Sequence, residues 1–180
     1  SVPNMHIMAP KNKWELSDML KFAVEFEGPI AIRYPRGEAY DGLEEYRQPI
    51  EYGKAEWIYK EQDIALLAVG SMVKTAESVY AKLKEQGKNV SLLNARFVKP
   101  IDEDAVLEAC EKHTLLVTLE ENVASGGYGE KVLDCLQKNG KDISLLRIAI
   151  PDAYVEHGSV DLLEKGIGMD VASITEQILE

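Results

Sequence analysis

Cysteine is scarce in this 180-residue sequence, and long apolar runs are missing. The two cysteines, Cys110 and Cys135, have no Cys-x-x-Cys spacing and no paired histidines beside them, so the sequence does not support a zinc site. Both lie on apolar faces of expected helices, which favours two buried thiols in a reducing cytoplasm over a disulfide. No stretch approaches the roughly 18 apolar residues of a membrane span, and the N-terminus shows no signal-peptide pattern.

Basic residues are also few, with 20 lysines and arginines against 31 acids and a net charge of −11. Nucleic acids and anionic membranes require basic patches, so neither is an expected partner. The negative net charge is still compatible with a small anionic substrate, because a few arginines at the binding site can make the local electrostatic potential positive. With 46% hydrophobic residues, we expect a packed, soluble, cytoplasmic protein.

The first 36 residues predict a strand, a helix and a strand. A short apolar run spans 5–9, Asn12 is a good N-cap with Glu15 as its capping-box partner, and 30–34 is a compact strand. The helix between them should bury one stripe, namely Leu16, Met19, Leu20, Ala23 and Phe26. This unit is too small to bury its own faces, so we expect 1–36 to be the remnant of a larger α/β domain, packed as an appendage.

Residues 37–52 are rich in Gly, Pro, Tyr and acids without a period, which predicts a linker. From 53 to 180 strands and helices alternate, which is typical of a three-layer α/β domain with a mostly parallel sheet. The short turn at 60–63 makes the strands before and after it antiparallel, so the Trp57 strand should be the antiparallel edge. The expected strands are 55–59, 64–69, 90–94, 115–119 and 143–148, and the expected helices are 73–86, 103–111, 128–138 and two short ones capped by Ser159 and Asp170.

The most informative stretch is Arg33-Tyr34-Pro35-Arg36-Gly37, at the carboxyl end of an expected strand. Side chains alternate along a strand, so Arg33 and Tyr34 face opposite ways, and Pro35 then re-aims Arg36. A guanidinium at this place in an acidic protein suits a phosphate, but it suits a salt bridge to one of the many acids equally well. The residues alone leave both interpretations open.

Two further motifs favour structural roles. Glu120-Glu121-Asn122 ends a central strand, where two carboxylates either do acid–base work, hold an interface or cap the following glycine loop. The loop Gly126-Gly127-Tyr128-Gly129 opens a helix but lacks dinucleotide-binding spacing and a P-loop lysine. His6, His113 and His157 favour surface or capping roles, since none has a Ser or Cys partner at a nucleophile spacing.

Several stretches together resemble one family. They are Pro3-Asn4-Met5 with Met8-Ala9-Pro10-Lys11, Gly28 to Gly37, Arg96-Phe97-Val98-Lys99-Pro100-Ile101-Asp102, Glu120-Glu121-Asn122 with Gly126-Gly127, and Ile150-Pro151-Asp152 with Glu156-His157-Gly158. The Arg96-to-Asp102 element is similar in outline throughout the transketolase superfamily. The combination of Tyr34-Pro35-Arg36-Gly37 with the Glu120-to-Gly127 stretch resembles the 1-deoxy-D-xylulose-5-phosphate synthase family more closely.

The resemblance implies a thiamine-diphosphate- and Mg²⁺-dependent homodimeric transferase. Such an enzyme decarboxylates pyruvate and joins the remaining carbons to glyceraldehyde 3-phosphate, releasing CO2, and its product feeds isoprenoid, thiamine and pyridoxal synthesis. It also implies that Arg36 contacts the phosphate of the aldehyde, with Arg33 and Tyr34 as weaker neighbouring candidates.

The family's diphosphate and metal motif, Gly-Asp-Gly followed by Asn-Asn, does not occur in the sequence. We therefore expect a C-terminal fragment that is inactive by itself, with no catalytic, cofactor-binding or metal-binding residue of its own. The alternatives are the same domain of a transketolase or of a 2-oxo-acid dehydrogenase β subunit, or a non-catalytic dimerisation module.

Overall fold

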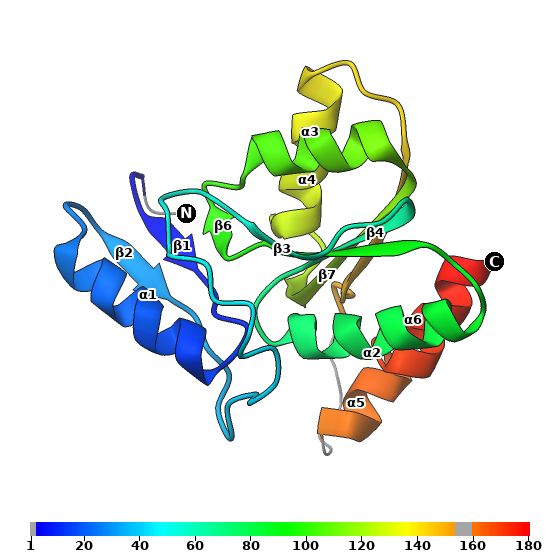
Figure 1. The fold of residues 1–180 in the computed structure, drawn as a ribbon, viewed down its shortest axis with the longest axis horizontal. Helices are drawn as coiled ribbons and strands as arrows, with labels where there is room; N and C mark the ends of the chain where they lie inside the picture. The colour runs from blue at the N-terminus through cyan, green and yellow to red at the C-terminus, as the bar shows by residue number, and fades with distance from the viewer. Residues whose placement is uncertain (1–2, 154–159) are drawn as a thin grey trace.

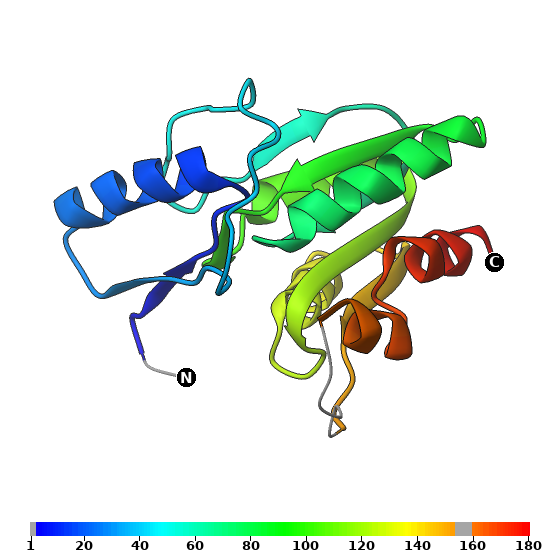
Figure 2. The same cartoon turned by 90° about the horizontal axis from the view of Figure 1, so that it is seen from below.

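The computed structural model describes residues 3–153 and 160–180, and shows a larger α/β unit with a smaller unit beside it (Figure 1). The larger unit has helices on both faces of a central sheet, as the alternation predicted. The smaller unit contains the first helix and lies at one end of the larger sheet in both views (Figure 2).

Five strands form the central sheet in the order β3-β5-β4-β7-β8. β4, β5, β7 and β8 are mutually parallel, and β3 pairs with β5 in the antiparallel sense at the edge. The predicted fold class, including the antiparallel edge at Trp57, is therefore confirmed. The strands are β3 (Glu56–Tyr59), β4 (Asp63–Ala68), β5 (Val90–Asn94), β7 (His113–Val123) and β8 (Ser144–Ile150).

The turn at 60–63 behaves differently from a hairpin. β3 runs opposite to β4, as expected, but the two strands do not pair, because β5 lies between them. The chain thus crosses over β5 at the edge of the sheet, with the Glu61 N–H donating to Ser91 Oγ at 2.8 Å on the strand it crosses.

Two cores explain why the strands are apolar almost throughout. Alternate residues of a strand point to opposite faces, and Ile64, Leu66 and Ala68 join one core while Ala65 and Leu67 join the other. Helices α2 and α6 cover the first face and α3 and α4 the second (Figure 1). The helices are α2 (Met72–Glu85), α3 (Glu103–Lys112), α4 (Tyr128–Lys138), α5 (Val160–Gly166) and α6 (Val171–Leu179).

Local signals in this unit are confirmed where they can be checked. Asp170 caps α6 by accepting hydrogen bonds from the Ala172 and Ser173 amides. Both cysteines are free thiols on helices as predicted, although Cys110 is half-buried and only Cys135 is buried. The proposed cap Ser159 lies outside the described residues.

The smaller unit is not a mere appendage, because a strand of the larger unit completes its sheet. β1 (His6–Met8) pairs in parallel with β2 (Ile30–Ile32) and antiparallel with β6 (Phe97–Lys99), a strand that sequence reasoning missed. Phe97 is fully buried there against Met8 and Met19.

Helix α1 (Lys13–Glu25) covers this small sheet less completely than predicted. Met19 is buried, but Leu20 is 52% exposed, so the expected apolar stripe is only partly confirmed. The Asn12 side chain does accept from the Glu15 amide at 2.9 Å, as a cap should. The Glu15 carboxylate, however, accepts from the Lys11 amide and not from that of Asn12.

Residues 37–52 contain no helix or strand, yet they pack closely. Leu43 is buried in the larger core, and the Asn12 side-chain amide donates to the Gly42 carbonyl at 3.0 Å. The Lys13 amide donates to the Tyr40 carbonyl at 3.1 Å. The segment is therefore held against both units along its length.

Candidate functional site

Three adjoining cavities open where the two units meet. They have volumes of about 420, 290 and 530 Å³, and Pro35 and Ser71 line all three. Together they form what we call the groove. It lies beyond the carboxyl ends of β2, β4 and β7, which is where open α/β sheets place their ligands.

The turn from β4 into α2 shapes the floor of the groove. Gly70 has a φ of +57°, which favours glycine, and a Cβ there would lie 3.1 Å from the Cβ of Ala9. The close approach lets Ser71 reach the groove, where its hydroxyl donates to Glu121 at 2.6 Å. Glycine at position 70 thus brings the larger unit against the smaller one.

All three residues singled out in the sequence line this groove. Arg36 borders the 420 and 530 Å³ cavities, Arg33 the 290 Å³ cavity, and Tyr34 the 420 and 290 Å³ cavities. Arg36 is exposed and makes no hydrogen bond or ion pair with the described part of the chain. The alternative of a salt bridge therefore has no support among those residues.

Sequence reasoning missed the groove residues that come from other segments. Lys74, in the first turn of α2, lines the same two cavities as Arg36. Its ammonium lies 5.7 Å from the centre of the Tyr40 ring, and the Tyr40 hydroxyl donates to Glu77. Burial and the Glu77 carboxylate raise the pKa of Tyr40, so this hydroxyl stays protonated. The only signal in the sequence was the Gly70-Ser71 turn after a strand.

Glu120 is a structural residue, as the sequence favoured. Its side chain is buried, and its two carboxylate oxygens accept from the Tyr128 and Gly129 amides at 2.7 and 2.8 Å. A Cβ on Gly127 would lie 2.5 Å from this carboxylate. The amides that a phosphate would need at the start of α4 are thus already engaged.

The histidines also have structural surroundings. His113 Nε2 lies 2.7 Å from Ser91 Oγ, a spatial pair that the sequence spacing concealed. The other ring nitrogen, Nδ1, lies 2.7 Å from the Ala109 carbonyl, so it donates there and caps the end of α3. Both residues are buried near the amino-terminal ends of β5 and β7, whereas the groove lies at the carboxyl ends of the strands, which argues against a nucleophilic pair. His6 packs edge-on against Phe26, and His157 lies outside the described residues.

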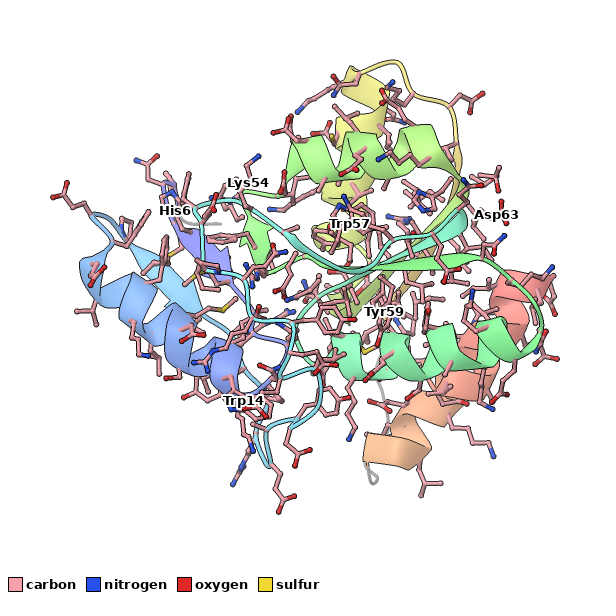
Figure 3. All side chains as sticks on the ribbon, viewed as in Figure 1. His6, Trp14, Lys54, Trp57, Tyr59 and Asp63 are labelled. Atoms are coloured by element: carbon pink, nitrogen blue, oxygen red, sulfur yellow. The ribbon has the colours of Figure 1, made fainter. Side chains whose placement is uncertain are left out.

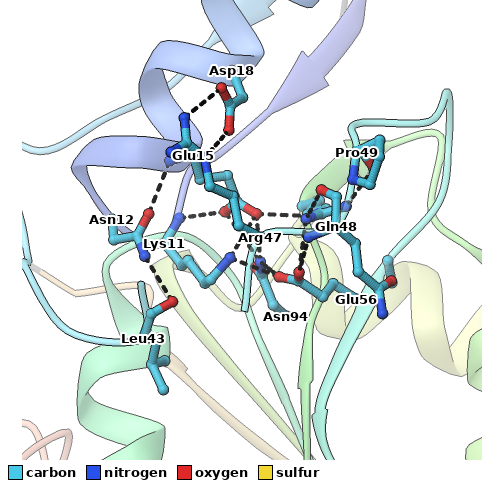
Figure 4. A network of polar contacts seen from close by, with 12 residues as sticks. Lys11, Asn12, Glu15, Asp18, Leu43, Arg47, Gln48, Pro49, Glu56 and Asn94 are labelled. Atoms are coloured by element: carbon cyan, nitrogen blue, oxygen red, sulfur yellow. Dashed lines mark hydrogen bonds and ion pairs between the residues drawn. The ribbon is translucent and has the colours of Figure 1, made fainter. Parts of the chain in front are cut away.

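Beside the groove lies a buried network of charges, which we call the ionic cluster (Figure 4). It consists of two cations, two carboxylates and one amide, each at most 2% exposed: Lys11, Arg96, Glu15, Glu56 and Asn94. Lys11 Nζ contacts Glu15 at 3.0 Å and Glu56 at 2.6 Å, while Arg96 contacts the same carboxylates at 2.8 and 3.0 Å.

Backbone groups complete the ionic cluster. Arg96 donates to the carbonyls of Gln48 and Pro49, and the Gln48 amide donates to Glu56. Arg96 itself has a φ of +56°, a conformation that costs a non-glycine residue about 1–3 kcal/mol and persists only when its surroundings hold it. The cluster is neutral overall and joins the first unit, the 37–52 segment and the larger unit.

Two further large pKa shifts, those of Glu108 and Tyr59, lie away from the groove. Hydrogen bonding to Lys112, with Lys60 and Trp57 adding to it, lowers the pKa of Glu108 to about 2. Trp57, on the edge strand, is labelled in Figure 3 with Lys54 and Tyr59. Burial, with the Glu77 carboxylate next, raises the pKa of Tyr59 to about 12. These groups stabilise the edge of the sheet and do not mark a reactive site.

The described residues offer little to a metal ion. No group of three or more His, Cys, Asp or Glu side chains among them is arranged to bind one. Within the same residues no helix has the length and apolar character needed to cross a membrane. Arg36 and Lys74 both line the 420 and 530 Å³ cavities and have no ion pair with the described residues.

Comparisons with known proteins agree with this architecture. Residues 53–174 match the family model for the transketolase C-terminal domain. The chain is 46% identical to a 1-deoxy-D-xylulose-5-phosphate synthase from Lachnoclostridium phytofermentans and 44% identical to one from Syntrophomonas wolfei. Each match covers 98% of this chain and 28% of the relative, so the chain spans a little over a quarter of their length.

One solved structure shares the fold over almost the whole chain. It is described as a split-gene transketolase, an inactive β4 tetramer, and matches with a TM-score of 0.87. The match covers 99% of this chain and 57% of the other, at 22% sequence identity. The small unit and the larger one thus recur together in the same arrangement.

Proposed function

The chain belongs to the transketolase C-terminal domain family, and from that premise we propose that it is the C-terminal part of a 1-deoxy-D-xylulose-5-phosphate synthase. The proposed activity is a thiamine-diphosphate-dependent transfer that condenses pyruvate with glyceraldehyde 3-phosphate and releases CO2. The relatives of that name, which resemble this chain over nearly all its length, support the proposal.

The chain's own contribution is to bind the phosphate of the aldehyde acceptor through Arg36. One observation carries this role: Arg36 borders two adjoining cavities and has no acid partner among the described residues. A guanidinium offers two parallel charge-assisted hydrogen bonds to a phosphate, which fixes the acceptor in orientation as well as in place. Arg33 and Tyr34 are neighbours with smaller roles.

The described residues do not supply an arrangement that suits the cofactor. The described part has no carboxylate group arranged for Mg²⁺, and its best candidate for diphosphate binding, the glycine loop before α4, is occupied by Glu120. Thiamine diphosphate and Mg²⁺ are therefore assigned to the rest of the synthase, a cytoplasmic homodimer in this proposal. The chain by itself is then inactive.

The test is Arg36→Ala in the complete synthase. Removing one partner of a desolvated charge pair typically costs about 2–5 kcal/mol, so kcat/KM for glyceraldehyde 3-phosphate should fall roughly 30-fold or more. Arg33→Ala provides the matched control, with a smaller loss expected. Steady-state kinetics with the phosphorylated aldehyde and with an unphosphorylated one make the measurement specific.

The unphosphorylated acceptor should be nearly indifferent to Arg36→Ala, because it never made the lost contact. Equal losses with both acceptors would contradict the assignment and make Arg36 a residue that maintains the fold. For Arg36→Lys, kcat/KM for glyceraldehyde 3-phosphate should lie between the values of the unaltered enzyme and of Arg36→Ala, since an ammonium replaces the guanidinium only as a point charge.

A further inference from the structure

The two largest cavities of the groove share four residues, and two of these are cations: Pro35, Arg36, Ser71 and Lys74. The cations come from different units, Arg36 from the end of β2 and Lys74 from α2. Neither has an ion pair with the described residues. The chain as a whole has a net charge of −11, so two such cations on one cavity reverse the sign of the charge locally.

The charges that line the 420 Å³ cavity favour an anion. Besides Arg36 and Lys74 it is lined by Glu38 and by Lys11, whose ammonium is already shared between two carboxylates of the ionic cluster. The 530 Å³ cavity has the same two cations but two acids as well, Glu121 and Glu164. The smaller cavity is therefore the more cationic of the two.

Lys74 is held toward this cavity by its neighbours. The Tyr40 ring, which also lines it, lies under the ammonium, and the bond from the Tyr40 hydroxyl to Glu77 fixes the ring. A cation over an aromatic face gains roughly 0.5–1 kcal/mol at an exposed site, enough to bias a flexible side chain without neutralising it. No acidic residue lies in the first turn of α2, so the positive end of that helix adds to the field.

We propose that Lys74 is the second phosphate-binding cation of the groove and sets its specificity for phosphorylated acceptors together with Arg36. This inference rests on the proposed function. A phosphate monoester carries a charge of about −1.5 to −2 near neutral pH, so a single guanidinium leaves about half of it uncompensated. Lys74 supplies the remaining charge from α2, so both units contribute to the site.

The experiment compares Lys74→Ala, Lys74→Arg and Lys82→Ala in the complete synthase. Lys82 is the control, because it lies on the same helix but borders a separate cavity near the end of α2. Lys74→Ala should raise KM for glyceraldehyde 3-phosphate about tenfold, as expected for losing one hydrogen bond to a charged group. It should leave KM for an unphosphorylated aldehyde unchanged, and Lys74→Arg should retain most of the affinity.

Inorganic phosphate gives a second measurement that does not depend on turnover. Its binding, followed by ³¹P NMR titration, should weaken about tenfold in Lys74→Ala and stay unchanged in Lys82→Ala. Unchanged KM and phosphate binding in Lys74→Ala would overturn the inference, and so would equal losses with both aldehydes. If the complete synthase does not condense pyruvate with the aldehyde, the proposed function fails, and the phosphate titration alone decides the role of Lys74.

Discussion

The ionic cluster and the groove lie side by side, and both contain lysine and arginine, yet they use these charges in opposite ways. Lys11 is 2% exposed and contacts two carboxylates, while Lys74 is exposed and has the Tyr40 ring beneath it but no ion pair among the described residues. Both residues line the 420 Å³ cavity. The comparison teaches that position at a cavity does not define a binding residue; what matters is whether its charge is already neutralised by the protein.

Within the ionic cluster the whole set of charges is interdependent. Burying an ion is unfavourable unless partners surround it, so removing one carboxylate leaves two buried cations to share the other one. We therefore expect the cluster to contribute less to stability than to the specification of one arrangement of the two units. Arg36 and Lys74 have no such partner in the part of the chain that the structure describes.

The largest effect is expected from Glu56→Ala, which removes a partner from both Lys11 and Arg96. Breaking a buried ion pair by deleting one member typically lowers the free energy of unfolding by about 3–5 kcal/mol. Urea-induced unfolding of this chain measures it. Asp134→Ala, which breaks an exposed pair with Lys138, is the control, and its free energy of unfolding should equal that of the unaltered chain within experimental error. A loss as small as that of the control would mean that the ionic cluster is hydrated and not structural.

The adjacent acids Glu120 and Glu121, both on β7, show the same contrast between a charge that is buried with protein partners and one that is exposed at the groove. Glu120→Ala leaves two buried amides unsatisfied and should lower the free energy of unfolding by about 1–3 kcal/mol. Glu121 is exposed at the groove, so Glu121→Ala should change it by less than about 0.5 kcal/mol. Parallel urea titrations decide this, and similar losses for both variants would contradict the assignment of Glu120 alone to structure.

The smallest effect concerns pH and the exposed network at Glu108. Its pKa is lowered from 4.5 to about 2, so its contribution to stability is present above pH 4.5 and is lost as the pH falls toward 2. In Glu108→Gln the free energy of unfolding should therefore depend less on pH between 4.5 and 2, and the groove should not change. Urea unfolding at pH 5, 4 and 3 tests it. An identical pH dependence in the variant and in the unaltered chain would refute the depressed pKa.

The sequence predicted those parts of the fold that depend on local patterns. The parallel strands, the helices α2 and α4 and the caps at Asn12 and Asp170 follow from periodicity and from side chains two or three residues apart. β6 escaped prediction because it is three residues long, precedes a proline, and owes its existence to pairing with β1 some ninety residues earlier.

The same reason limited the prediction of the site. Arg36 could be singled out because it follows a strand, whereas Lys74 and Tyr40 reach the groove only through tertiary packing. Glu15 was correctly associated with a helix N-terminus, but its contact with Arg96 spans 81 residues. No spacing in the sequence indicates such a partner.

The pairing of β1 with β6 has a consequence for anyone who would divide this protein into parts. Sheet completion by a strand from elsewhere is how many proteins capture an extended peptide, and here donor and recipient belong to one chain. Trimming the chain to its larger unit would strip the backbone of β6 of its partner and uncover the Phe97 ring. A bare edge of this kind is a template for unwanted association between molecules. The unit that packs together therefore extends beyond residues 53–174, which match the family model. A shortened chain would have to keep β1 for β6 to stay paired.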